Sequence, residues 1–125
     1  MITQIQQLPD NMVGFRASGE VTKSDFEPVL QTVEQFVERN DKLNYMLVLD
    51  TSPKEFTAGA WLQDGLMGIK HITKWNRAAI VTDSDEVIQF TDAFSKLMPG
   101  EFKGFRREEL QTAIDWTSEQ IELKN

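Results

Sequence analysis

His71, the only histidine of the chain, and Asp64 are the pair of residues whose types could carry acid–base catalysis. They are seven residues apart, which on a helix rising about 1.5 Å per residue separates them by roughly 10 Å. That separation is too long for a hydrogen bond, so the two residues do not form a catalytic dyad. We interpret His71 as a side chain at the margin of an apolar helix face that hydrogen-bonds a backbone carbonyl.

Nucleophilic and metal chemistry lack their usual sequence signals. Thr51 and Ser52 are hydroxyls near a strand end, but no serine lies in a G-x-S-x-G turn. The loop over 50–56 contains no glycine, which argues against a phosphate-binding loop. The chain has no cysteine and a single histidine, which excludes a thiolate site and a multi-histidine metal site within one chain. We therefore expect no catalytic residue, no metal and no cofactor.

The segment 57–77 (TAGAWLQDGLMGIKHITKWNR) has the composition of a helix with a wide apolar face. At about 100° per residue its large apolar side chains cover roughly half of the circumference, more than a core-facing stripe needs. Its basic residues are Lys70, Lys74 and Arg77, and one acidic residue, Asp64, leaves a formal charge of +2. Apolar surface and positive charge together suit a ligand-binding or membrane-binding face. The residues expected to make this contact are Trp61, Leu62, Asp64, Leu66, Ile69, Lys70, His71, Trp75 and Arg77.

Length, composition and charge exclude several classes of protein. The 125 residues, 40% apolar and 26% charged, fit a single globular domain over 1–125. A net charge of −7 argues against nucleic-acid binding, because that binding depends on clustered Lys and Arg. No apolar run approaches the roughly 20 residues of a membrane span, and no signal-peptide pattern precedes the first strand-like segment. We expect a cytoplasmic protein, attached to a membrane at most peripherally.

The spacing of apolar residues predicts an N-terminal hairpin followed by alternating helices and strands. Ser24 and Glu27 form a capping-box pair ahead of a clean apolar stripe, and the turn composition at Pro9-Asp10-Asn11 separates the two hairpin strands. The order ββαβαβαβα implies parallel pairing through right-handed crossovers. The predicted strands are 2–8, 12–18, 45–50, 77–82 and 101–105, and the predicted helices follow Ser24 and span 57–77, about 85–97 and from about 108.

These elements and their motifs resemble the SpoIIAA-like group, small bacterial STAS-type proteins related in sequence profile to the CRAL-TRIO lipid-transfer domains. The resemblance rests on an LVLD strand, an F-x-x-G-A-W helix start, a G-x-K-H stretch and R-A-A-I-V-T-D. It implies an α/β fold: a mixed sheet with an antiparallel N-terminal hairpin, then parallel βα units, and about four helices. It also implies a binding or regulatory role in place of catalysis.

One branch of this group is switched by phosphorylation of a serine in a D-S-S/T-G stretch. If Phe56 is aligned with the residue before that stretch, Ala58, Gly59 and Ala60 stand where the acid and the serines would be. The acceptor serine is therefore missing, and Thr57 is the nearby hydroxyl.

The other branch agrees better with the residues. CRAL-TRIO-type proteins hold an apolar ligand beneath an amphipathic helix, and the segment 57–77 has that chemistry. We expect a non-enzymatic binding module that takes a hydrophobic small molecule, a lipid or a membrane surface through this segment. The alternatives are a regulatory protein-interaction module of the anti-sigma-factor-antagonist type, or a homodimer that buries the same face.

Overall fold

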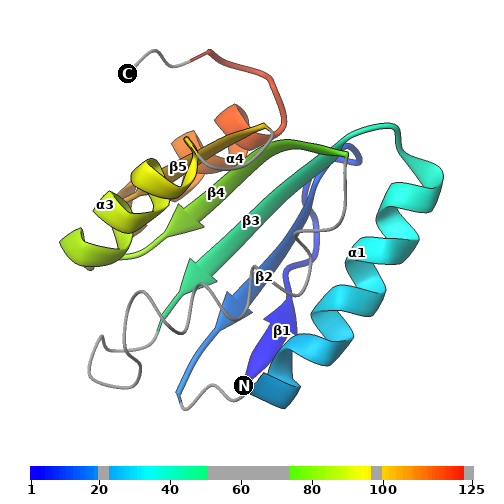
Figure 1. Ribbon diagram of the computed structural model, residues 1–125, viewed down its shortest axis with the longest axis horizontal. Helices are drawn as coiled ribbons and strands as arrows, with labels where there is room; N and C mark the ends of the chain where they lie inside the picture. The colour runs from blue at the N-terminus through cyan, green and yellow to red at the C-terminus, as the bar shows by residue number, and fades with distance from the viewer. Residues whose placement is uncertain (20–22, 51–73, 97–99, 123–125) are drawn as a thin grey trace.

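The computed structural model describes residues 1–19, 23–50, 74–96 and 100–122. In these ranges one sheet contains five strands in the order β1-β2-β3-β4-β5 (Figure 1). β1 is antiparallel to β2, whereas every later pair of neighbours is parallel. The expected mixed sheet with an N-terminal antiparallel hairpin is thus confirmed. The strands are β1 Ile2–Gln4, β2 Val13–Ala17, β3 Leu43–Leu49, β4 Trp75–Val81 and β5 Glu101–Phe105.

Three α-helices lie in the described ranges, where about four were expected: α1 Glu27–Arg39, α3 Asp85–Phe94 and α4 Leu110–Thr117. The remaining helix was predicted over 57–77, and its residues 57–73 lie outside the described ranges. Its predicted end is wrong, because Trp75 and Arg77 belong to β4. The strand therefore begins two residues before the predicted position at Arg77.

The start of α1 also differs from the sequence prediction. A short 3-10 helix, η1 Lys23–Phe26, precedes α1, so Ser24 lies inside a helical turn and Phe26 is the N-cap residue. The apolar stripe itself is confirmed, because Val29, Val33 and Phe36 are buried. Packing of this stripe on the sheet stabilises the helix, as is usual for amphipathic helices in globular proteins.

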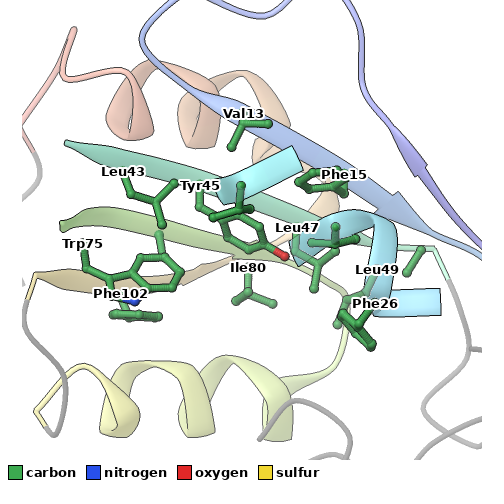
Figure 2. Close-up of a cluster of buried hydrophobic side chains, with 14 of the residues drawn as sticks. Val13, Phe15, Phe26, Leu43, Tyr45, Leu47, Leu49, Trp75, Ile80 and Phe102 are labelled. Atoms are coloured by element: carbon green, nitrogen blue, oxygen red, sulfur yellow. The ribbon is translucent and has the colours of Figure 1, made fainter. Parts of the chain in front are cut away.

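Both faces of the sheet are covered. All seven residues of β3 are buried, as expected for a strand with helices on both sides. Figure 2 shows α3 and α4 on opposite sides of the sheet. On the side of α1 and α3 the first core contains Val13, Phe15, Ala17, Phe26, Val29, Val33, Phe36, Leu43, Tyr45, Leu47, Leu49, Trp75, Ala78, Ile80, Val87 and Phe102. On the side of α4 the second core contains Met12, Met46, Val48, Ala79, Val81, Phe105, Ala113 and Trp116.

β5 is an edge strand, as predicted, and side chains of the α3 region satisfy its outward amides. The Phe102 amide donates to Ser95 Oγ at 2.9 Å, and the Gly104 amide donates to Asp92 Oδ1 at 3.0 Å. These hydrogen bonds occupy donors that an edge strand otherwise offers to another chain. The helix lies close to the strand, since a Cβ at Gly104 would stand 2.8 Å from Ile88 Cα.

We predict that Gly104→Ala lowers the free energy of unfolding by about 1–3 kcal/mol, because the backbone of α3 at Ile88 must move to accept the methyl group. Gly14→Ala is the matched control in β2, where the one close contact of the added Cβ is with the end of the flexible Leu8 side chain and Met46 lies at ordinary van der Waals distance. Urea denaturation of both variants measures the difference. Equal losses would show that the contact with α3 is not the cause.

Candidate functional site

Most of the residues predicted to contact a ligand lie in the range 51–73, outside the described residues. They are Trp61, Leu62, Asp64, Leu66, Ile69, Lys70 and His71, and Thr57 lies in the same range. Their roles stay predictions. The other two predicted residues, Trp75 and Arg77, are described and buried.

Trp75 is a residue of the first core. Its side chain is part of an aromatic cluster, with ring centroids 5.8 Å from Tyr45 and 5.0 Å from Phe102 (Figure 2). It is only 6% exposed, and its backbone pairs with Leu43 of β3. This placement corrects the prediction that Trp75 lies on the binding helix.

Arg77 is an internal anchor of the C-terminal segment. The residue is 5% exposed, and its Nη1 donates to the carbonyls of Trp116 and Ile121 at 2.6 and 3.1 Å. Its Nη2 pairs with Glu122 at 2.6 Å, and its guanidinium lies 5.1 Å from the Trp116 ring centroid. Because the chain itself occupies these donors, Arg77 holds α4 and the following residues against β4. This role corrects the expectation that Arg77 contacts a ligand head group.

A network of hydrogen-bonded asparagine side chains lies at the amino ends of β3 and β4. Asn44 donates to the Asn11 carbonyl at 3.0 Å, and Asn76 donates to Asn44 Oδ1 at 2.8 Å and to Glu119 Oε1 at 2.9 Å. The hydrogen bond from Asn76 is the main cause that lowers the pKa of Glu119 below its ordinary value, and Lys42 adds to it. A hollow of about 220 Å³ adjoins this network. The asparagine side chains that face it already donate to backbone carbonyls of the chain, so we assign the network a structural role.

A second group of charges lies at the carboxyl ends of the parallel strands. Asp50 directly follows β3 and binds two arginines, with Arg16 Nη1 at 2.5 Å from Oδ2 and Arg107 Nη2 at 3.1 Å from Oδ1. Arg107 also lies 3.5 Å from Asp83, which follows β4. We call Arg16, Asp50, Asp83 and Arg107 the carboxyl-edge cluster. It joins the ends of strands β2, β3, β4 and β5.

The position and exposure of the carboxyl-edge cluster make it the candidate site. In open α/β sheets, ligands bind outside the carboxyl ends of the strands. The side chains of Arg16 and Arg107 are 39% and 48% exposed, so both guanidinium groups reach solvent. Asp50 Oδ1 is buried and has no hydrogen bond to a residue that the structure describes, although Arg107 lies within ion-pair distance. The segment 51–73 begins at the next residue of the chain.

Two described hydroxyl groups after β4 form hydrogen bonds with backbone amides. Thr82 Oγ1 accepts from the Ser84 amide, and Ser84 Oγ accepts from the Val87 amide as the N-cap of α3. Within the described ranges no group of three His, Cys, Asp or Glu side chains could hold a metal ion. No helix in those ranges is long and apolar enough to cross a membrane. The described residues of the carboxyl edge thus offer arginine donors for binding a carboxylate or phosphate.

Sequence reasoning missed Arg16, Asn44 and Asn76. The two asparagines interrupt apolar runs at the starts of β3 and β4, and the predicted strands began one residue after each of them. A buried polar residue inside an apolar run signals a hydrogen-bonded pair, and this signal could have extended both strands.

We predict that Arg77→Lys lowers the free energy of unfolding by about 2 kcal/mol, because an ammonium group cannot reproduce the fork that reaches Trp116, Ile121 and Glu122. Arg106→Lys is the control on a partly exposed arginine. Denaturation followed by tryptophan fluorescence compares the two variants. A loss at Arg77 no larger than the loss at Arg106 would contradict the anchoring role.

We predict that Asp50→Asn lowers the free energy of unfolding by about 1 kcal/mol, since two partly exposed ion pairs are lost. The difference from wild type should shrink at about 0.5 M salt, where exposed charges are screened. Asp83→Asn, at a more exposed carboxylate with a longer ion pair, should change stability little. Equal effects at both positions would show that Asp50 is not the centre of the cluster.

Comparisons with known proteins agree with this architecture. The sequence profile of the SpoIIAA-like family matches residues 12–118. A crystal structure of an uncharacterised DUF3478-family protein from Shewanella loihica, described as having a SpoIIAA-like fold, is similar with a TM-score of 0.62 and 26% sequence identity, over 94% of this chain and 92% of that chain. A search of curated proteins gave no match. Because the profile covers well over half of the sequence, this chain belongs to the SpoIIAA-like family.

Proposed function

We propose that the protein is a non-enzymatic binding module that takes a hydrophobic small molecule or lipid through the segment 57–73 and the carboxyl edge of its sheet. The observation that carries this proposal is the position of Asp50. It follows the central strand β3 and lies between two partly exposed arginines, and the segment with the widest apolar pattern starts seven residues later, at Thr57. Apolar contact and charge thus adjoin each other along the chain.

The chemistry of the segment matches that of an amphiphile. Trp61, Leu62, Leu66 and Ile69 supply the apolar contacts, while Lys70 and His71 meet a polar head group. Arg16 and Arg107 add donors at the carboxyl edge, where their side chains reach solvent. Trp75 and Arg77 are left out of this surface, because the first is in the core and the second is bonded to the C-terminal segment.

The proposal predicts that the wild-type protein retains lipid in native mass spectrometry or floats with vesicles of phosphatidylcholine and phosphatidylglycerol. Ile69→Asp should reduce binding at least about tenfold, since a charge replaces an apolar contact. Gln35→Asp adds the same charge at an exposed position of α1 and should leave binding unchanged. Circular dichroism checks that both variants are folded.

Two outcomes would contradict this function. Absence of retained lipid and of flotation in the wild-type protein would remove lipid binding altogether. A stable dimer in light scattering that Ile69→Asp dissociates, without any lipid binding, would assign the segment to self-association. If the wild-type protein binds no lipid and remains monomeric, a regulatory protein partner becomes the leading alternative.

A further inference from the structure

A cavity of about 240 Å³ lies between the end of α1 and the connection that joins β1 to β2. This corner is at the opposite end of the sheet from the carboxyl-edge cluster (Figure 1). Every residue that lines the cavity is among those that the structure describes. The Ile5 amide donates to the Gly14 carbonyl at 2.9 Å, and the Asn11 side chain donates to the Ser118 carbonyl at 2.8 Å. The connection is thus held at both of its ends, so the cavity is preformed.

The cavity combines buried apolar side chains with two exposed charges. Met12, Val13 and Phe36 line it and are buried. Asp10 of the connection and Arg39 in the last turn of α1 also line it and are exposed. Among the described residues, no ion pair joins either of these charges to another side chain. A carboxylate and a guanidinium group therefore border the same small apolar space.

The backbone of the connection is strained where it borders the cavity. Gln7, one of the lining residues, has a φ of 63°, in the left-handed region that glycine and asparagine favour. Such conformations are costly for other residues and are concentrated at binding sites, where the surrounding structure holds them. Gln4 and Gln6 line the cavity as well, and a glutamine amide can donate to a carboxylate or accept from an ammonium group. The strained connection thus supplies polar groups that suit either charge of a ligand.

Size and charge together limit what the cavity can hold. Sites for drug-sized ligands usually measure about 300–1,000 Å³, so this cavity of about 240 Å³ suits a molecule smaller than a lipid. An apolar acid would place its carboxylate near Asp10, and an apolar amine would place its ammonium group near Arg39, so each meets a like charge. A molecule with one carboxylate and one ammonium group pairs with both side chains.

We propose that this cavity is a binding site for a free α-amino acid with a branched apolar side chain. The carboxylate of the ligand binds the Arg39 guanidinium group, and its ammonium group binds the Asp10 carboxylate. Its apolar side chain packs on Met12 and Phe36. The site is separate from the segment 57–73 and from the carboxyl edge, so this inference does not rest on the proposed function.

Three probes of nearly equal size test the two charged contacts. L-Leucine has both charged groups, 4-methylpentanoate lacks the ammonium group, and 3-methylbutylamine lacks the carboxylate. The NMR chemical shifts of the backbone amides of Gln7, Thr32 and Arg39 follow each titration, because these residues line the cavity. We expect leucine to shift these amides and to bind about tenfold more tightly than either analogue, since each analogue lacks one hydrogen bond between charged groups.

Two variants assign the charged contacts to their residues. Arg39→Gln should weaken the binding of leucine and 4-methylpentanoate about tenfold without weakening that of 3-methylbutylamine, which has no carboxylate to lose. Asp10→Asn should weaken leucine and 3-methylbutylamine without weakening 4-methylpentanoate. Lys96→Gln removes an exposed positive charge just after α3 and should change none of the affinities. Circular dichroism checks that the variants are folded.

Three results would overturn the inference. They are amides that leucine does not shift, equal affinity for the three probes, or an Arg39→Gln variant that weakens all three probes equally, which would indicate a structural role. Ile69→Asp, the variant that tests the proposed function, should leave leucine binding unchanged. Loss of lipid binding in wild type with leucine binding kept would refute the proposed function alone, and the reverse result would refute this site alone.

Discussion

β3 is buried along its whole length, and most of the fold is a consequence of covering its two faces. Side chains alternate along a strand, so Tyr45 and Leu47 enter the first core while Met46 and Val48 enter the second. α1 and α3 pack on one face, and α4 packs on the other. β2 and β4 satisfy the backbone of β3 through parallel pairing on both sides. A strand covered in this way meets water only at its ends, and its polar neighbours gather there.

The polar side chains at the two ends of β3 differ in how far the chain itself occupies them. At the amino end, Asn44 and Asn76 bond each other and their neighbours, and Arg77 ties the C-terminal segment to the same region. Each of these groups is occupied by the chain itself. At the carboxyl end, Asp50 is bound by arginines whose side chains still reach solvent, and one of its oxygens is buried without a hydrogen bond from the described part of the chain. The amino end is therefore a closed structural junction, whereas the carboxyl end keeps donors available. This contrast supports the proposed binding site at the carboxyl end on physical grounds that do not depend on family membership.

Local patterns predicted the parts of the fold that local interactions decide. The stripe of α1, the apolar run of β3, the hairpin and the edge strand β5 all follow from spacing within one segment. The prediction of the helix end failed because Trp75 follows Ile72 by three residues, a spacing that places both side chains on one face of a helix. Pairing with Leu43 and ring contacts with Tyr45 and Phe102 place Trp75 in β4, and these partners are about 30 residues away along the chain in either direction. Arg77 was misassigned for the same reason, since its partners come from the C-terminal segment.

Buried polar side chains on both faces of the sheet form hydrogen bonds within the chain. On the α4 side, the buried polar side chains are bonded: Asn44 to the Asn11 carbonyl, Arg77 to Trp116 and Thr117 to the Ala113 carbonyl. On the α3 side, the hydroxyl of Thr91 donates to the Val87 carbonyl of its own helix. The chain itself thus satisfies these groups, whereas the arginines of the carboxyl-edge cluster keep side chains that reach solvent, which favours that cluster as the proposed binding site.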